Sequence, residues 1–265
     1  MGESRIVTQD PESEGSGPKA SAAAQTPPGE PRPSDPPLND RGVRREDFCD
    51  EWIEALAAKA RRLGNYPMLS KEEREASRQG FLRAIAPGQD VWVFGYGSLM
   101  WNPALHVEES RAGRIYGHHR VFCLNMLMGR GSPECPGLML ALDRGGSCHG
   151  MAHRIATENV DAELRILWMR EMLGGTYVPR WVEVRTTAGV VRAITFVANQ
   201  RHPRYAGKLP PTSVIERIAQ AAGELGTNRY YLYRLTEHLD ELGIVDGPMH
   251  RLAAGVRART VGTPD

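Results

Sequence analysis

The stretch from Val91 to Trp101, VWVFGYGSLMW, places the strongest constraint on what this chain can fold into. Its first four residues are β-branched or aromatic, which favours a buried strand, and Gly95 and Gly97 then interrupt the run. Glycine allows backbone angles that other residues avoid, and bare backbone can approach a small anion with its N–H groups. We therefore expect a core strand that delivers a ligand-binding loop.

This stretch could also be a dinucleotide-binding loop or a plain tight turn. A dinucleotide-binding loop would need a third glycine where Met100 stands and a helix where Pro103 stands, so this fingerprint fits poorly. For an isolated Gly-x-Gly, a tight turn without a ligand is the simpler interpretation. The choice between a ligand-binding loop and a plain turn therefore depends on motifs further along the chain.

The order of the predicted elements favours an α+β fold with its strands in the middle of the chain. Helices are expected at 46–63, 70–85, 160–172 and 228–242, and in a segment capped by Ser213 with Glu216. Strands are expected at 114–124, 138–142 and 148–155, separated by glycine-rich turns, and as a hairpin at 178–185 and 190–198.

Composition divides the chain into four parts. Residues 1–44 are polar, with six prolines between Pro27 and Pro37, and are expected to form a disordered tail. Residues 45–88 are expected to be a helical extension packed on the core, 89–250 the main domain, and 251–265 a C-terminal tail.

Charge and hydropathy favour a small-molecule partner. The 33 Lys and Arg residues nearly balance the 32 Asp and Glu residues, so no long-range field attracts nucleic acid or an anionic membrane. The sequence shows neither an apolar signal core near Met1 nor an apolar run long enough to span a bilayer. We expect a soluble, cytoplasmic protein of unknown oligomeric state.

Neither a metal site nor a disulfide framework is predicted. The four cysteines, Cys49, Cys123, Cys135 and Cys148, form no C-x-x-C pair, which favours reduced thiols. His149 and His153 have the spacing of zinc ligands on a helix, but their surroundings are typical of a strand.

Glu171 is the strongest candidate for a catalytic residue. It shares one helical face with Leu164, Leu167 and Trp168, and it lies in the last turn of its predicted helix. Burial and the negative end of the helix dipole both disfavour the ionised carboxylate, which raises its pKa toward that of a useful general base. An ion pair with Arg170 or Arg180 in a structural role accounts for the spacing equally well.

Four blocks in the same order carry a family resemblance. They are FGYGSLMW at 94–101, RGSPECPG at 130–137, REM followed by GGTY within 170–177, and NRYYL at 228–232. Through these blocks the chain resembles the ChaC-type γ-glutamylcyclotransferases over about residues 90–247. The resemblance implies a small, mostly antiparallel barrel-like sheet flanked by helices, no cofactor and no metal, and Glu171 as the catalytic residue.

The implied reaction is the release of 5-oxoproline and Cys-Gly from glutathione, by attack of the γ-glutamyl α-amine on its own γ-carbonyl. The block at 130–137 favours glutathione over other γ-glutamyl compounds. Two alternatives stay open: a non-catalytic regulator of cation transport, and a cyclotransferase for other γ-glutamyl amines or amino acids. Because Met172 and Leu173 lengthen the link to the glycine pair, the role of Tyr177 is also open.

The expected substrate-binding residues come mainly from the glycine loop. They are Val93, Phe94, Gly95, Tyr96, Gly97, Ser98, Leu99, Arg120 and Tyr231. The loop would bind the α-carboxylate or the developing oxyanion through its N–H groups. Arg120 would meet a substrate carboxylate, although an exposed strand charge accounts for it as well, and Tyr230 is expected to serve packing.

Overall fold

The computed structural model describes residues 44–63 and 66–260, together with Met1. The predicted tail therefore falls, apart from Met1 and Arg44, outside the described residues, as do residues 261–265.

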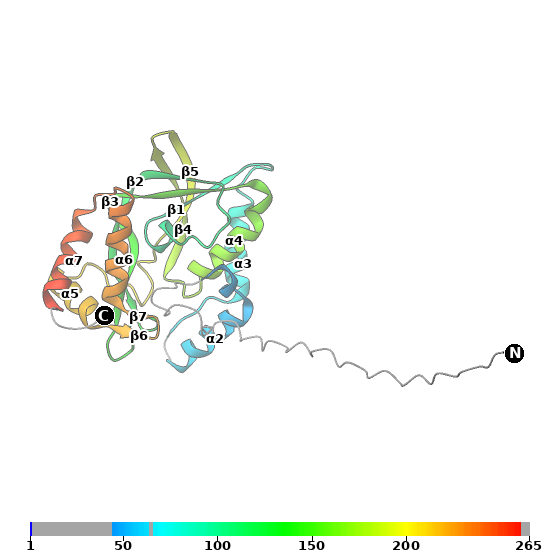
Figure 1. Ribbon diagram of the computed structural model, residues 1–265. Coiled ribbons are helices and arrows are strands. Elements are labelled where there is room, and N and C mark those ends of the chain that lie inside the picture. Colours follow the sequence, from blue (N-terminus) through cyan, green and yellow to red (C-terminus); the bar gives the residue numbers. More distant parts are fainter. Residues whose placement is uncertain (2–43, 64–65, 261–265) are drawn as a thin grey trace.

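Five strands form a closed barrel at the centre of the molecule (Figure 1). They are β1 (Val91–Gly95), β2 (Glu109–Met126), β3 (Gly137–Ile155), β4 (Tyr177–Thr186) and β5 (Gly189–Ala198), in the order β1-β3-β2-β4-β5. All neighbours in that order pair antiparallel, while parallel pairing of β1 with β5 closes the barrel. The α+β prediction with a mostly antiparallel barrel is confirmed.

The strands β2 and β3 are much longer than predicted. The glycine-rich segment at 143–146 does not end a strand, because β3 runs through it while paired with β2. Gly117, Gly145 and Gly146 have positive φ angles of 82°, 92° and 69°, and the register shifts beside them. Glycine here forms a bulge that bends two paired strands, which the sequence alone does not distinguish from a turn.

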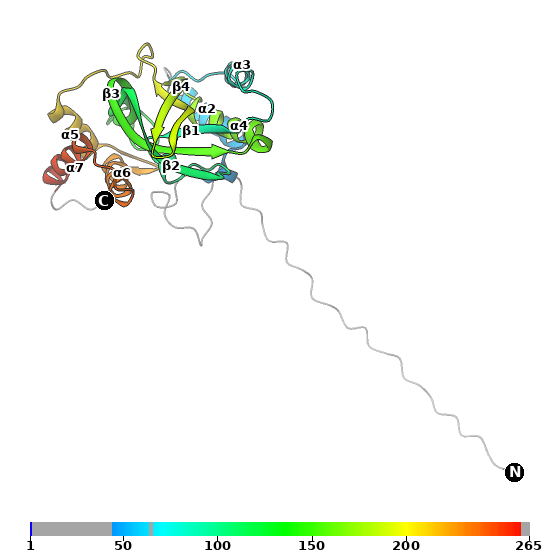
Figure 2. The same cartoon turned by 90° about the horizontal axis from the view of Figure 1, so that it is seen from above.

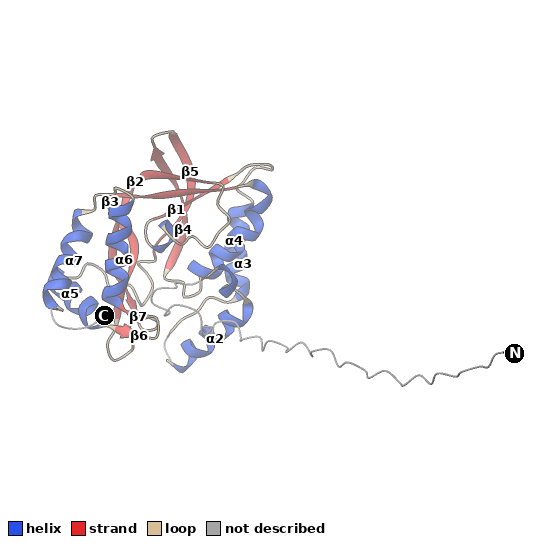
Figure 3. Cartoon of the chain, viewed as in Figure 1, coloured by secondary structure: helices blue, strands red, loops and turns tan. Residues whose placement is uncertain are grey.

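Helices cover the barrel in two groups on opposite sides, coloured blue in Figure 3. The first group contains α2 (Asp50–Arg62), α3 (Lys71–Leu82) and α4 (Val160–Glu171); the second contains α5 (Pro211–Gln220), α6 (Asn228–Glu241) and α7 (Gly247–Arg259). Figure 2, viewed from above, shows the same separation. The remaining elements are short: η1 (Arg45–Asp47), η2 (Ser98–Met100), η3 (Thr157–Asn159), β6 (Ala222–Gly223) and β7 (Gly226–Thr227).

The starts of two helices test the predicted caps. The capping box of α3 is confirmed, since the amide of Glu73 donates to Ser70 Oγ at 3.1 Å and the amide of Ser70 donates to the Glu73 carboxylate at 2.7 Å. The cap at Ser213 is wrong, because α5 already begins at Pro211, whose fixed φ suits a first helical position.

The C-terminal boundary also differs from the prediction. Residues 251–259 continue α7 instead of forming a tail, and Ala253 and Val256 of this helix are buried. Its stripe of small side chains packs on α5 and α6 but gives a weak hydrophobic signal in the sequence.

The helix α3 and the residues next to it pack against α4. Leu69 and Phe81 contact the apolar cluster that contains Leu164 and Trp168. Arg45 forms a two-pronged ion pair with the buried Glu163 on α4. None of the helices in the described part of the chain is long and apolar enough to cross a membrane.

Candidate active site

A small pocket lies where β1 ends, between residues supplied from both sides of the barrel. Its lining consists of Tyr96, Gly97, Ser98, Leu99, Leu140, Glu171, Tyr177, Phe196 and Tyr231. Glu171 comes from α4 and Tyr231 from α6, which lie on opposite sides of β1 in Figures 1 and 2. The free space is about 40 Å³, room for a few water molecules.

Glu171 is the last residue of α4 and lies on the buried side of this helix. Leu164, Leu167 and Trp168 on the same side are almost completely buried, and only 14% of the Glu171 side chain is exposed. Burial raises the pKa of this carboxyl group above its ordinary value of 4.5, while the neighbouring Arg170 acts in the opposite direction. The net direction is upward, as predicted for a general base.

Arg170 connects Glu171 to the glycine loop. Its Nε lies 3.0 Å from Glu171 Oε1, and its Nη2 donates to Ser98 Oγ at 2.8 Å. Its Nη1 donates to the carbonyl oxygens of Asn102 and Pro103 at 2.7 and 3.2 Å. The predicted ion pair therefore exists, and it holds the Glu171 carboxylate in the pocket.

Three phenol groups surround this carboxylate. Burial raises the pKa values of Tyr96, Tyr177 and Tyr231, and the negative charge of Glu171 adds to the effect at each of them. Tyr177 donates to the carbonyl oxygen of Leu140 at 2.7 Å, and the Tyr231 hydroxyl is hydrogen-bonded to the Ser98 backbone. All three therefore remain neutral hydroxyl groups near neutral pH.

The glycine loop is held rigidly by bonds to its carbonyl oxygens. Thr195 Oγ1 donates to Phe94 O at 2.9 Å, Arg120 Nε to Tyr96 O at 2.5 Å, and the Met100 amide to Gly97 O at 2.8 Å. Neither Gly95 nor Gly97 has a positive φ, but Gly97 has φ −130° and ψ −133°, outside the main regions that other residues populate. Close packing is a second reason for glycine at this position, because a Cβ on Gly97 would lie 2.9 Å from Tyr231 Oη and 3.2 Å from Leu140 Cδ2.

We predict that Gly97→Ala lowers kcat/KM by about tenfold or more, because the new methyl group displaces the Tyr231 hydroxyl from the pocket. Gly80→Ala is the matched control, since a Cβ at this position of α3 meets nothing within 4 Å. Gly97→Ala should also lower the melting temperature, and adding Tyr231→Phe, which removes the colliding oxygen, should recover part of this loss. Unchanged kinetics of Gly97→Ala would contradict this account of the loop.

A second prediction concerns pH. Because the pKa of Glu171 is raised in the folded protein, the ascending limb of kcat/KM should lie above pH 4.5, where the carboxylate becomes ionised. The stabilising contribution of the same group is complete below its unfolded pKa and is lost as the pH rises through the folded pKa. Activity and this part of the stability therefore change in opposite directions. Parallel pH series of kcat/KM and Tm test this, and an ascending limb below pH 4.5 would contradict it.

The structure places four of the predicted binding residues outside the pocket lining. Val93 and Phe94 are completely buried in two different apolar clusters, where they anchor β1. At Gly95 a Cβ would lie 2.9 Å from Leu99, so this residue allows the loop to fold back on itself. These three residues support the loop. The fourth residue, Arg120, donates a hydrogen bond to the Tyr96 carbonyl oxygen of the loop.

Arg120 is not an exposed strand charge, and it lies outside the pocket lining. It is 4% exposed, and its Nη1 pairs with Asp246 at the start of α7. Its Nε and Nη2 donate to the carbonyl oxygens of Tyr96 and His149, the latter at 2.6 Å. The alternation of side chains along β2 predicts only the face on which Arg120 lies, whereas its hydrogen-bond acceptors come from three distant parts of the chain.

Among the described residues, no group of three or more His, Cys, Asp or Glu side chains could hold a metal ion. His149 and His153 both lie on β3, and the two ring nitrogens of His153 contact Ser110 Oγ and Leu99 O. The thiols of Cys49, Cys123, Cys135 and Cys148 are all free. A larger hollow of about 440 Å³ between α2, α3 and α4 contains charges that pair with one another, such as Arg78 with Asp161.

Comparison with known proteins identifies the family. The model of the family described as "ChaC-like protein" matches residues 91–259. This chain belongs to that family. The chain is 43% identical over 189 residues to the glutathione-specific γ-glutamylcyclotransferase of Escherichia coli, covering 71% of this chain and 82% of that protein. It is 32% identical over 168 residues to glutathione-specific γ-glutamylcyclotransferase 1 of Homo sapiens, covering 62% and 76%.

A solved structure supports the fold of this ChaC-like protein. The γ-glutamylcyclotransferase specific to glutathione from yeast matches with a TM-score of 0.58 at 21% identity, over 64% of this chain and 96% of that one. The barrel with flanking helices is thus the γ-glutamylcyclotransferase fold.

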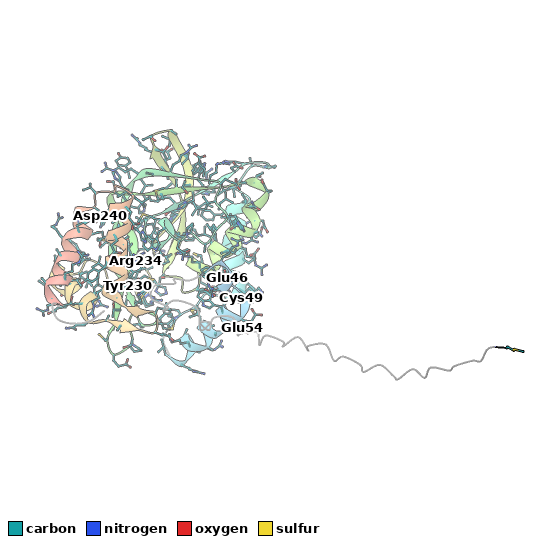
Figure 4. The ribbon with its side chains drawn as sticks, in the orientation of Figure 1. Glu46, Cys49, Glu54, Tyr230, Arg234 and Asp240 are labelled. Atoms are coloured by element: carbon teal, nitrogen blue, oxygen red, sulfur yellow. The ribbon has the colours of Figure 1, made fainter. Side chains whose placement is uncertain are left out.

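The remaining family blocks also converge near the pocket. The guanidinium of Arg130 lies 5.5 Å from the ring centre of Tyr230, labelled on α6 in Figure 4, and 6.0 Å from that of Tyr231. The prediction did not include Leu140, Tyr177 and Phe196 in the lining. Tyr177 belongs to the family block within 170–177, so the sequence did contain a signal for it. Nothing in the sequence distinguishes Leu140 or Phe196 from other core residues of a strand.

Proposed function

We propose that this protein is a γ-glutamylcyclotransferase that cleaves glutathione into 5-oxoproline and Cys-Gly. The observation that carries the proposal is the buried carboxyl group of Glu171, which has a raised pKa and faces the glycine loop and three neutral phenols. Membership in the ChaC-like family and the names of the relatives from Escherichia coli and Homo sapiens support glutathione as the substrate.

The reaction needs a base and a rigid pocket more than a strong electrophile. The α-amine nitrogen forms a bond to the γ-carbonyl carbon of the same residue, and the bond from that carbon to the cysteinyl nitrogen breaks. Glu171 accepts the proton that the amine loses and returns it to the departing nitrogen. Because nucleophile and carbonyl belong to one substrate, the pocket mainly has to hold the γ-glutamyl group in its curled form.

Two further parts of the pocket complete the mechanism. The hydroxyl groups of Ser98 and Tyr231 can donate hydrogen bonds to the oxyanion that develops on the γ-carbonyl oxygen. Arg170 keeps Glu171 and Ser98 in fixed relative positions through its two side-chain contacts. We further propose that the N–H groups of the loop from Gly95 to Leu99 bind the α-carboxylate of the substrate.

A cytoplasmic location of the protein remains a prediction.

The test is to incubate the purified protein with glutathione and, separately, with γ-glutamyl-alanine, and to measure 5-oxoproline. We expect 5-oxoproline and Cys-Gly in equal amounts from glutathione and little product from γ-glutamyl-alanine. A preference for γ-glutamyl-alanine would mean that the substrates are other γ-glutamyl compounds and not glutathione. Absence of 5-oxoproline from both would contradict an enzymatic function and favour a regulator.

A further inference from the structure

Arg204, in the loop after β5, is a buried cation without an anionic partner among the described residues. Only 6% of this residue is exposed. Its Nε donates to Asn125 O at 2.8 Å, and the Asn125 amide donates to Arg204 O at 2.7 Å, which fixes the residue to the end of β2. Within the described part of the chain, Nη1 and Nη2 form no hydrogen bond, and no carboxylate pairs with them. Neither nitrogen is among the described polar atoms that are both fully buried and unpartnered, so both keep contact with solvent and are accessible to an anion.

The position of Arg204 is next to the proposed active site. A Cβ on Gly174, three residues after Glu171, would lie 3.2 Å from Arg204 Nη1, so the guanidinium lies against the turn that follows α4. The Tyr177 phenol, which lines the pocket, is subject to the charges of both Glu171 and Arg204. Arg204 therefore lies on the Tyr177 side of the pocket.

The segment before α3 covers one face of this guanidinium. The ring centre of Tyr66 lies 4.3 Å from Arg204 Cζ, and the Leu69 amide donates to Leu173 O at 2.9 Å. Gly174 leaves room for this approach, because a Cβ there would lie 3.2 Å from Arg204 Nη1. Gly175 has a φ angle of 65°, a conformation that favours glycine. Stacking on Tyr66 fixes the plane of the guanidinium, so its two terminal nitrogens are oriented as a fork for a carboxylate.

We propose that Arg204 binds the terminal carboxylate of the leaving peptide, which in glutathione is the carboxylate of glycine. This inference rests on the proposed function. The glycine carboxylate lies about two residues from the scissile bond, at most about 7 Å along an extended chain, so the group that binds it has to lie close to the pocket. Arg204 would then recognise a peptide with a free carboxylate at this position and disfavour amines or amides that lack it.

The experiment compares glutathione with its analogue in which the glycine carboxylate is replaced by a neutral amide. Both compounds carry the same γ-glutamyl group and release the same 5-oxoproline. A difference in kcat/KM between them, measured with the full-length protein, therefore reflects only the distal charge. We expect kcat/KM to be about 10- to 100-fold higher for glutathione, mainly through KM. Arg204→Gln should lower kcat/KM for glutathione to the value measured for the amide.

Two further variants separate recognition from stability. Arg201→Gln, which changes an exposed arginine in the same loop, should keep the preference for glutathione. Arg204→Lys retains the charge but lacks the fork, and should retain part of the preference, which keeps the test valid if Arg204→Gln does not fold.

The inference is overturned if the wild-type protein processes both compounds equally, or if Arg204→Gln lowers both rates by the same factor, as expected for a purely structural anchor of Tyr66. Either result leaves the proposed function intact, because 5-oxoproline is still released. If neither compound yields 5-oxoproline with the wild-type protein, the proposed function itself fails.

Discussion

Glu171→Gln is expected to abolish 5-oxoproline release while the protein stays folded and still binds glutathione. Glutamine has nearly the same size and can still accept a hydrogen bond from Arg170, but it cannot take the proton from the substrate amine. Removal of a general base costs on the order of a hundredfold to ten-thousandfold in rate. The loss should appear in kcat, because the interaction that disappears belongs to the transition state.

Glu163→Gln is the matched control for this variant. Glu163 is a second buried carboxylate on α4, but its oxygens are occupied by Arg45 and the His106 amide. We expect Glu163→Gln to lower the melting temperature and to leave the turnover of the folded protein unchanged. Melting temperature, glutathione affinity and turnover measured on both variants decide the assignment: near wild-type turnover of a folded Glu171→Gln protein would contradict it.

Arg120→Met is expected to have the largest effect on stability. The change takes the guanidinium away from the Asp246 carboxylate, which is 16% exposed and keeps the Met249 amide as a donor. It also removes the arginine donor from the carbonyl oxygens of Tyr96 and His149. Removing one partner of a buried pair costs about 3 kcal/mol or more, so the melting temperature should fall by on the order of 10 °C.

Arg114→Met on the same strand serves as the control. Arg114 is exposed; among the described residues it donates to Ser147 Oγ and lies 5.1 Å from the ring centre of the exposed Tyr116. Its loss should therefore change the free energy of unfolding by less than about 0.5 kcal/mol. Thermal unfolding of both variants provides the comparison. If Arg120 contacted the substrate, Arg120→Met would instead raise KM in a protein of normal stability, and our assignment of a structural role would be wrong.

The sequence predicted most of the local structure because the local signals were strong. The capping box of Ser70 with Glu73, the hairpin of β4 and β5, and the burial of Glu171 on one face of α4 each depend on residues close together in the chain. The glycine-rich segment at 143–146 was misjudged because glycine permits both a turn and a bulge, and only the pairing of β2 with β3 decides between them.

For the site, local sequence signals were enough to predict the type of chemistry: a carboxyl group on a buried helix face, and a glycine loop after a core strand. Which groups meet there depends on contacts between distant parts of the chain. Arg170 bridges Glu171 and Ser98, Arg120 turns inward to Asp246, and Arg204 lies against the ring of Tyr66. Most of these contacts join residues that are far apart in the chain. Local periodicity gives the face on which a side chain lies, whereas its partners depend on how the barrel closes.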